Sequence, residues 1–117
     1  MTNCVFVYGS LLDDAVVAEV IGRTVPTRPA VLEGYERVQV AGFPYPFVRP
    51  CHGQRVSGRL MLDLTVEDLQ RLDEYEDVDL GLYRRVEVTV RAEGDAPRRA
   101  WVYVMPDERR REGPLDG

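Results

Sequence analysis

Residues 5–22 read VFVYGSLLDDAVVAEVIG, a stretch that changes from a strand pattern to a helix pattern within a few positions. The β-branched and aromatic residues at its start predict a strand buried on both faces, which Gly9 ends in a turn. Asp13 or Asp14 then caps a short helix with apolar residues at helical spacing, and Gly22 ends this helix. The chain therefore begins inside the core.

The second half of the chain contains clearer elements. Residues 55–64 predict a strand, and Gly58 in its interior indicates a bulge or a close approach of another backbone. Residues 65–76 have the capping residue and apolar stripe of a helix. Residues 83–91 and 99–105 predict two long strands joined by a Gly- and Pro-containing turn, which is typical of a hairpin.

Residues 24–50 are rich in proline, so we expect irregular strand and loop there, with 35–40 as the best strand candidate. Strands outnumber helices along the chain, and the two do not alternate strictly, which excludes a doubly wound sheet. The sequence therefore predicts an α+β fold with a small barrel-like sheet. We expect this fold to form a single domain at residues 1–105, followed by a polar tail at 106–117.

Composition excludes several classes of protein. A chain of 117 residues has the size of one domain, and none of its segments approaches the roughly 20 apolar residues of a membrane-spanning helix. All 15 basic residues are arginine, and 20 acidic residues give a net charge of -5, which argues against a nucleic-acid partner. With one histidine and two cysteines, neither a metal site nor a disulfide framework is expected, and the predicted location is the cytoplasm.

The predicted helix at 65–76 places a carboxylate where an apolar side chain is expected. Its stripe of Val66, Leu69 and Leu72 continues to Tyr75 and Glu76 at helical spacing, so Glu76 points toward the interior. Burial, the helix C-terminus and three neighbouring acids would all raise its pKa toward that of a general base. The alternative is that the helix ends one residue earlier and Glu76 is a solvated acid.

The turn Tyr8-Gly9-Ser10-Leu11 is a second candidate. Glycine permits unusual backbone geometry, and successive N–H groups before a helix can bind a carboxylate or an oxyanion. A plain tight turn is the more common explanation of such a segment.

Two tyrosines of the predicted hairpin are further candidates. Tyr83 has the parity of the polar residues and faces either solvent or a polar cavity. Tyr103 shares its parity with Trp101, which fits either core packing or the edge of a pocket. Cys51 and His52 are adjacent in a predicted loop, so we interpret the cysteine as a loop thiol and expect neither a thiolate pair nor a serine triad.

Several motifs, in this order and spacing, resemble the γ-glutamylcyclotransferase-like (AIG2-like) family over residues 4–105. They are Val7-Tyr8-Gly9-Ser10-Leu11, Leu32-Glu33-Gly34-Tyr35, Val56-Ser57-Gly58, Leu72-Asp73-Glu74-Tyr75-Glu76, Tyr83-Arg84-Arg85 and Ala100-Trp101-Val102-Tyr103-Val104.

The resemblance implies a small mixed β-barrel flanked by helices and an enzyme that converts γ-glutamyl amines or peptides to 5-oxoproline without a cofactor. It further implies that Glu76 is the acid/base, and we expect substitution of the neighbouring Asp73 or Glu74 to leave most of the activity. The residues that it implies for substrate binding are Tyr8, Gly9, Ser10, Leu11, Tyr83 and Tyr103. The competing hypothesis is a non-catalytic module that binds a small metabolite on the same fold. Neither the particular γ-glutamyl compound nor the oligomeric state follows from the sequence.

Overall fold

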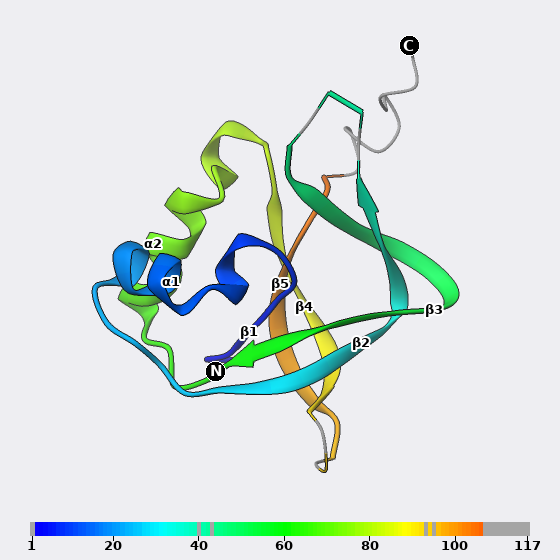
Figure 1. Cartoon of the computed structure of the whole chain (residues 1–117), viewed down its shortest axis with the longest axis horizontal. Coiled ribbons are helices and arrows are strands. Elements are labelled where there is room, and N and C mark those ends of the chain that lie inside the picture. The colour runs from blue at the N-terminus through cyan, green and yellow to red at the C-terminus, as the bar shows by residue number, and fades with distance from the viewer. Residues whose placement is uncertain (1, 40, 43, 93, 95, 107–117) are drawn as a thin grey trace.

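The computed structural model describes residues 2–39, 41–42, 44–92, 94 and 96–106 (Figure 1). Its elements are, in chain order, β1 (Val5–Val7), the 3-10 turn η1 (Ser10–Leu12), α1 (Asp14–Ile21), β2 (Thr27–Gln39), β3 (Pro46–Met61), α2 (Val66–Tyr75), the 3-10 turn η2 (Val78–Leu80), β4 (Arg84–Ala92) and β5 (Arg98–Val104).

The five strands form a closed barrel in the order β1-β3-β2-β4-β5. The β1–β5 pair is parallel and the β1–β3, β2–β3, β2–β4 and β4–β5 pairs are antiparallel, so the barrel is mixed. Figure 1 shows α1 and α2 beside each other on one side of this barrel. The predicted α+β fold is confirmed. The polar tail lies almost entirely outside the described residues, so the boundary between domain and tail stays a prediction.

Both helices have the predicted caps. The Asp13 carboxylate accepts a hydrogen bond from the Ala15 N–H at the start of α1, and Gly22 ends that helix in the left-handed conformation. At the start of α2, Thr65 and Asp68 form a reciprocal capping box. The sequence did not indicate η1, which separates the first strand from α1.

Strand structure at 35–39 is confirmed, and residue 40 lies outside the described residues, but the rest of residues 24–50 is less irregular than expected because two long strands, β2 and β3, occupy most of this segment. Proline is tolerated at the first residue of a strand, as at Pro46, or where its nitrogen donates no hydrogen bond to a neighbour. Cys51 and His52 accordingly lie within β3 and not in a loop. Within the described residues, the pairing of β2 with β3 shifts its register between Glu33 and Tyr35, which marks a bulge.

Alternation along the strands produces two apolar clusters. One cluster fills the barrel interior and includes Phe6, Tyr8 and Val102. The other joins the helices to the outside of the barrel and includes Leu72 and Tyr103. The chain thus places two candidate tyrosines in different layers, and the site lies where these layers meet.

The apolar stripe of α2 is shorter than predicted. Leu69 and Leu72 are buried, whereas Val66 is 54% exposed at the start of the helix.

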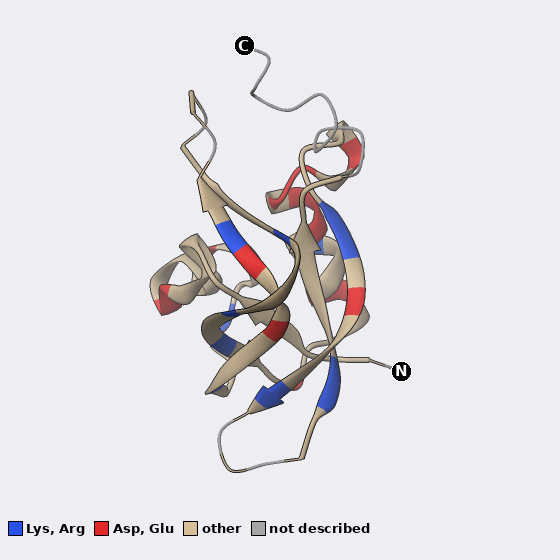
Figure 2. Cartoon of the chain, turned by 90° about the vertical axis from the view of Figure 1, so that its right-hand side faces the viewer, with Lys and Arg blue, Asp and Glu red and all other residues tan. Residues whose placement is uncertain are grey.

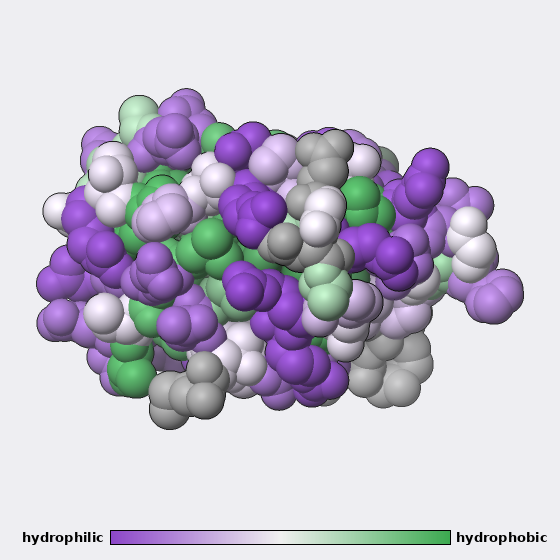
Figure 3. All heavy atoms as spheres, turned by 90° about the horizontal axis from the view of Figure 1, so that it is seen from below, coloured by the Kyte–Doolittle hydropathy of each residue, from purple (hydrophilic) through white to green (hydrophobic). Residues whose placement is uncertain are grey.

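On the face in Figure 3, hydrophobic residues lie between hydrophilic ones. Among the described residues, no helix is long and apolar enough to span a membrane.

Candidate functional site

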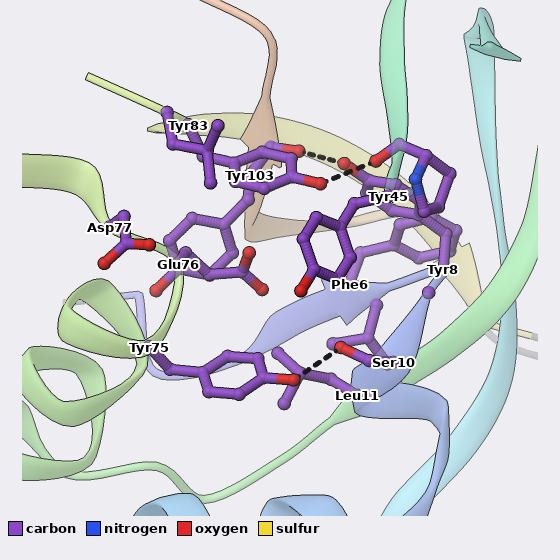
Figure 4. A pocket seen from close by; sticks show the side chains of 14 residues that line it. Phe6, Tyr8, Ser10, Leu11, Tyr45, Tyr75, Glu76, Asp77, Tyr83 and Tyr103 are labelled. Carbon is purple, nitrogen blue, oxygen red and sulfur yellow. Dashed lines mark hydrogen bonds between the residues drawn. The ribbon is translucent and has the colours of Figure 1, made fainter. Parts of the chain in front are cut away.

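A cavity of about 130 Å³ lies where the turn after β1 faces the end of α2. All seven candidate residues line this cavity, at Tyr8, Gly9, Ser10, Leu11, Glu76, Tyr83 and Tyr103. The structure therefore brings together, from four separate parts of the chain, the side chains that the sequence singled out (Figure 4).

Glu76 is held at the C-terminal cap of α2, where its N–H donates to the Leu72 carbonyl at 2.9 Å. The side chain is largely buried and lies in the cavity between Tyr83 and Tyr75 in Figure 4. Burial, and secondarily the negative charge of Asp77, raise the pKa of Glu76 from 4.5 to about 7. A carboxyl group with this pKa exchanges a proton readily at neutral pH.

This raised pKa predicts a pH-dependent cost in stability. The folded protein keeps the Glu76 proton up to about pH 7, whereas the unfolded chain loses it near 4.5, so the free energy of unfolding falls as the pH rises through this interval. At about 1.4 kcal/mol for each unit of pKa, the ionised carboxylate costs up to about 3 kcal/mol. We expect urea unfolding at about pH 5 and about pH 8 to show that the free energy of unfolding of Glu76→Gln, relative to that of the parent, increases by up to this amount from the lower to the higher pH. An equal difference at both pH values would mean that the carboxylate is solvated.

Three buried tyrosines surround Glu76, and the hydroxyl group of each donates a hydrogen bond to another part of the protein. Tyr8 donates to the Tyr103 carbonyl, Tyr83 donates to the Pro46 carbonyl at 2.7 Å, and Tyr103 donates to the Asp73 carboxylate at 2.7 Å. Burial raises the pKa of all three phenols, so they remain protonated at neutral pH. Their remaining lone pairs favour a ligand that donates hydrogen bonds, such as an ammonium group.

The turn after β1 forms the opposite wall of the cavity. Gly9 caps η1, and the first backbone hydrogen bond of this turn runs from the Leu12 N–H to the Gly9 carbonyl at 2.9 Å. The N–H groups that precede Leu12 are the ones that a helical turn cannot satisfy internally. Backbone N–H groups at such a position can bind a carboxylate or an oxyanion, and this role of the turn stays a prediction.

Sequence reasoning missed half of the cavity lining. The residues not predicted are Phe6, Val7, Tyr45, Pro46, Tyr75, Asp77 and Leu82. The hydroxyl groups of Tyr75 and Ser10 lie 2.8 Å apart and join the two walls. Tyr75 could have been predicted as a lining residue, because it lies beside Glu76 on the apolar stripe of α2. Tyr45 had no comparable signal, because it precedes a strand that was expected to be loop.

A family model described as gamma-glutamyl cyclotransferase, AIG2-like, matches residues 5–116. The chain belongs to this family. Protein AIG2 C of Arabidopsis thaliana is 36% identical over 96% of this chain and 68% of its own length. The chain spans 43–56% of the length of four further AIG2-like proteins of that plant.

Two solved structures and a further relative are also similar to this chain. A solution structure from Arabidopsis thaliana has a TM-score of 0.81 and 34% identity over 97% of this chain and 68% of its own. A solved structure named gamma-glutamyl cyclotransferase has a TM-score of 0.75 and 19% identity over 91% of this chain and 68% of its own. A Methanocaldococcus jannaschii protein named gamma-glutamylcyclotransferase and putative RNase is 30% identical over 86% of this chain and 44% of its own length.

The charged side chains that line the cavity are acidic. The cavity lining contains no lysine or arginine among the described residues, and its ionisable acids are Glu76 and Asp77. Figure 2 shows acids on and around the helices, and both acids and arginines along the strands. Within the part of the chain that the structure describes, no group of three or more potential metal ligands is found, and both Cys4 and Cys51 are free.

Proposed function

We propose that this chain is a γ-glutamyl cyclotransferase that converts a γ-glutamyl amine or γ-glutamyl peptide to 5-oxoproline. In this reaction the substrate's α-amine attacks its own γ-carbonyl carbon, a new C–N bond closes the five-membered ring, and the original amide C–N bond breaks. The released product is an amine or an amino acid. Since both reacting groups belong to one molecule, the enzyme has to hold the substrate with its α-amine close to its γ-carbonyl and to transfer protons.

Glu76 is the general base in this proposal, and its burial in the cavity with a raised pKa is the observation that carries it. As a carboxylate it removes a proton from the substrate's α-ammonium group, and as a carboxylic acid it returns that proton to the departing nitrogen. The attacking nitrogen loses a second proton as it becomes the lactam N–H, and the released amine takes up this proton and leaves as an ammonium ion, so atoms and charge balance without a metal or an organic cofactor. The phenol oxygens around Glu76 support the same assignment, because they accept hydrogen bonds from an ammonium group.

The turn at residues 9–11 is the substrate cradle. The described cavity lining contains no cationic side chain, and we assign the backbone N–H groups of this turn as donors to the substrate's α-carboxylate or to the oxyanion that forms on the γ-carbonyl. Such donors, fixed before the reaction, stabilise the developing charge without reorganisation.

The cradle predicts a contrast between two substitutions at Ser10. Ser10→Ala should change kcat/KM by about threefold or less, because it leaves the backbone donors in place. Ser10→Pro removes one donor and should reduce turnover by about 10²-fold or more. Initial rates of folded variants, checked by circular dichroism, test this. Equal losses in both variants would instead identify the serine hydroxyl as the chemical group.

The function is tested by incubating the protein with a panel of γ-glutamyl amines and γ-glutamyl dipeptides and measuring 5-oxoproline by mass spectrometry. Formation of 5-oxoproline together with an equal amount of the free amine supports the proposal. Saturable binding of these compounds without product would instead favour a non-catalytic module on the same fold.

A further inference from the structure

Asp73, Arg85 and Tyr103 form a connected cluster at the edge of the cavity, in which Tyr103 is the member that lines the cavity. Asp73 lies in the last turn of α2, while Arg85 on β4 and Tyr103 on β5 are partners in the sheet register. The guanidinium donates to Asp73 Oδ1 from Nε at 2.8 Å and to Oδ2 from Nη2 at 3.2 Å. The Tyr103 hydroxyl donates to the same Oδ1 at 2.7 Å. One carboxylate thus ties α2 to both strands of the hairpin.

This cluster is continuous with the candidate base. Glu76 follows Asp73 by three residues, which is about one helical turn, and its N–H is still bonded to the Leu72 carbonyl. On the other side, the Tyr103 carbonyl accepts the hydroxyl of Tyr8. Any movement of the last turn of α2 therefore changes the distance between the Glu76 carboxylate and the tyrosines that surround it.

The surroundings of Arg85 argue against a role in stability alone. Its side chain is 22% exposed, its guanidinium lies over the Trp101 ring at 4.3 Å, and its Nη1 is buried without a hydrogen-bond partner among the described residues. Removing an arginine from water is costly, and an incompletely paired one adds little net stability. The bidentate geometry instead fixes the orientation of Asp73.

We propose that Asp73 and Arg85 are positioning residues that hold the end of α2, and with it Glu76, against the Tyr103 side of the cavity. Neither of them lines the cavity, so they act through Glu76 and Tyr103. The kinetic part of this proposal rests on the proposed cyclotransferase function, whereas the geometric part does not.

The test compares Arg85→Gln with Arg99→Gln. Arg99 is a matched control because it pairs with Glu87 at 3.1 Å on the same hairpin, exposed and away from the cavity. We expect Arg85→Gln to lower kcat by about 10–100-fold with KM changed by about threefold or less, since misplacement of a catalytic group affects the reacting geometry. Arg99→Gln should retain parental kinetics. Arg85→Lys should recover part of the loss, because an ammonium still contacts Asp73 but lacks the planar fork.

A second readout requires no turnover. Hydrogen exchange is followed at the Glu76 amide, in the last turn of α2, and at the Leu69 amide, which donates to the Thr65 carbonyl in the first turn. Arg85→Gln should speed exchange at Glu76 by about tenfold or more and leave Leu69 unchanged, since the loosening is local. Uniform acceleration, or a pattern identical to that of Arg99→Gln, overturns the positioning role. If the parent shows no turnover, the proposed function fails, and the hydrogen-exchange comparison alone then tests whether Arg85 holds the end of α2 in place.

Discussion

Glu76→Gln is expected to lower kcat by about 10²–10⁴-fold while KM stays within a few-fold of the parent value. Glutamine keeps the shape of the side chain and can still occupy the cavity, but it cannot accept a proton from the substrate. The interaction lost is therefore one that develops only in the transition state. The measurement is the initial rate of 5-oxoproline release across a range of substrate concentrations.

The control is Glu74→Gln, because Glu74 lies two residues from Glu76 in the same acidic segment but is exposed. It should retain most of the activity. Asp73→Asn, which the sequence suggests as a second control, is unsuitable because Asp73 binds both Arg85 and Tyr103. If Glu74→Gln lost turnover while Glu76→Gln kept near-parental kcat, the base would be assigned to the wrong carboxylate.

Features fixed by neighbouring residues were predictable from the sequence. The capping box at Thr65 and the αL end of α1 at Gly22 depend on contacts within one turn of helix, and both are present in the structure. Glu76 was found in the same way, since helical spacing from Leu69 and Leu72 pointed it inward. The burial of Glu76 nevertheless depends on the tertiary structure, because the end of the helix faces the cavity and not the core.

Features that depend on two distant segments were not predictable. The strands β2 and β3 pair with each other over most of their length, and this pairing outweighs the local effect of their prolines. The Asp73–Arg85 pair joins a helix to a strand that follows it, so no spacing rule shows it. Tyr45 likewise lines the cavity together with residues that are distant in the sequence.

Gly58→Ala is expected to be the most destabilising single change in the barrel. A Cβ at Gly58 would overlap the carbonyl oxygen of Val7 and lie 2.8 Å from Phe6 Cζ. Because the first of these atoms is backbone in β1, a rotamer change cannot relieve the overlap, and β1 must move away from β3. We expect the free energy of unfolding to fall by about 3 kcal/mol or more, with Tm lowered by roughly 10 °C or more.

Gly34→Ala is the control that separates crowding from backbone strain. Gly34 has a φ of 83°, where alanine is strained by about 1–2 kcal/mol, but among the described residues no atom lies within 4 Å of the position that a Cβ would take there. Thermal and urea unfolding of both variants should therefore place Gly58→Ala clearly below Gly34→Ala. The folded fraction of Gly58→Ala should also lose turnover, because Val7 leads directly into Tyr8 and the cradle at residues 9–11. A cost at Gly58 no larger than that at Gly34 would show that β1 and β3 do not approach as closely as the barrel requires.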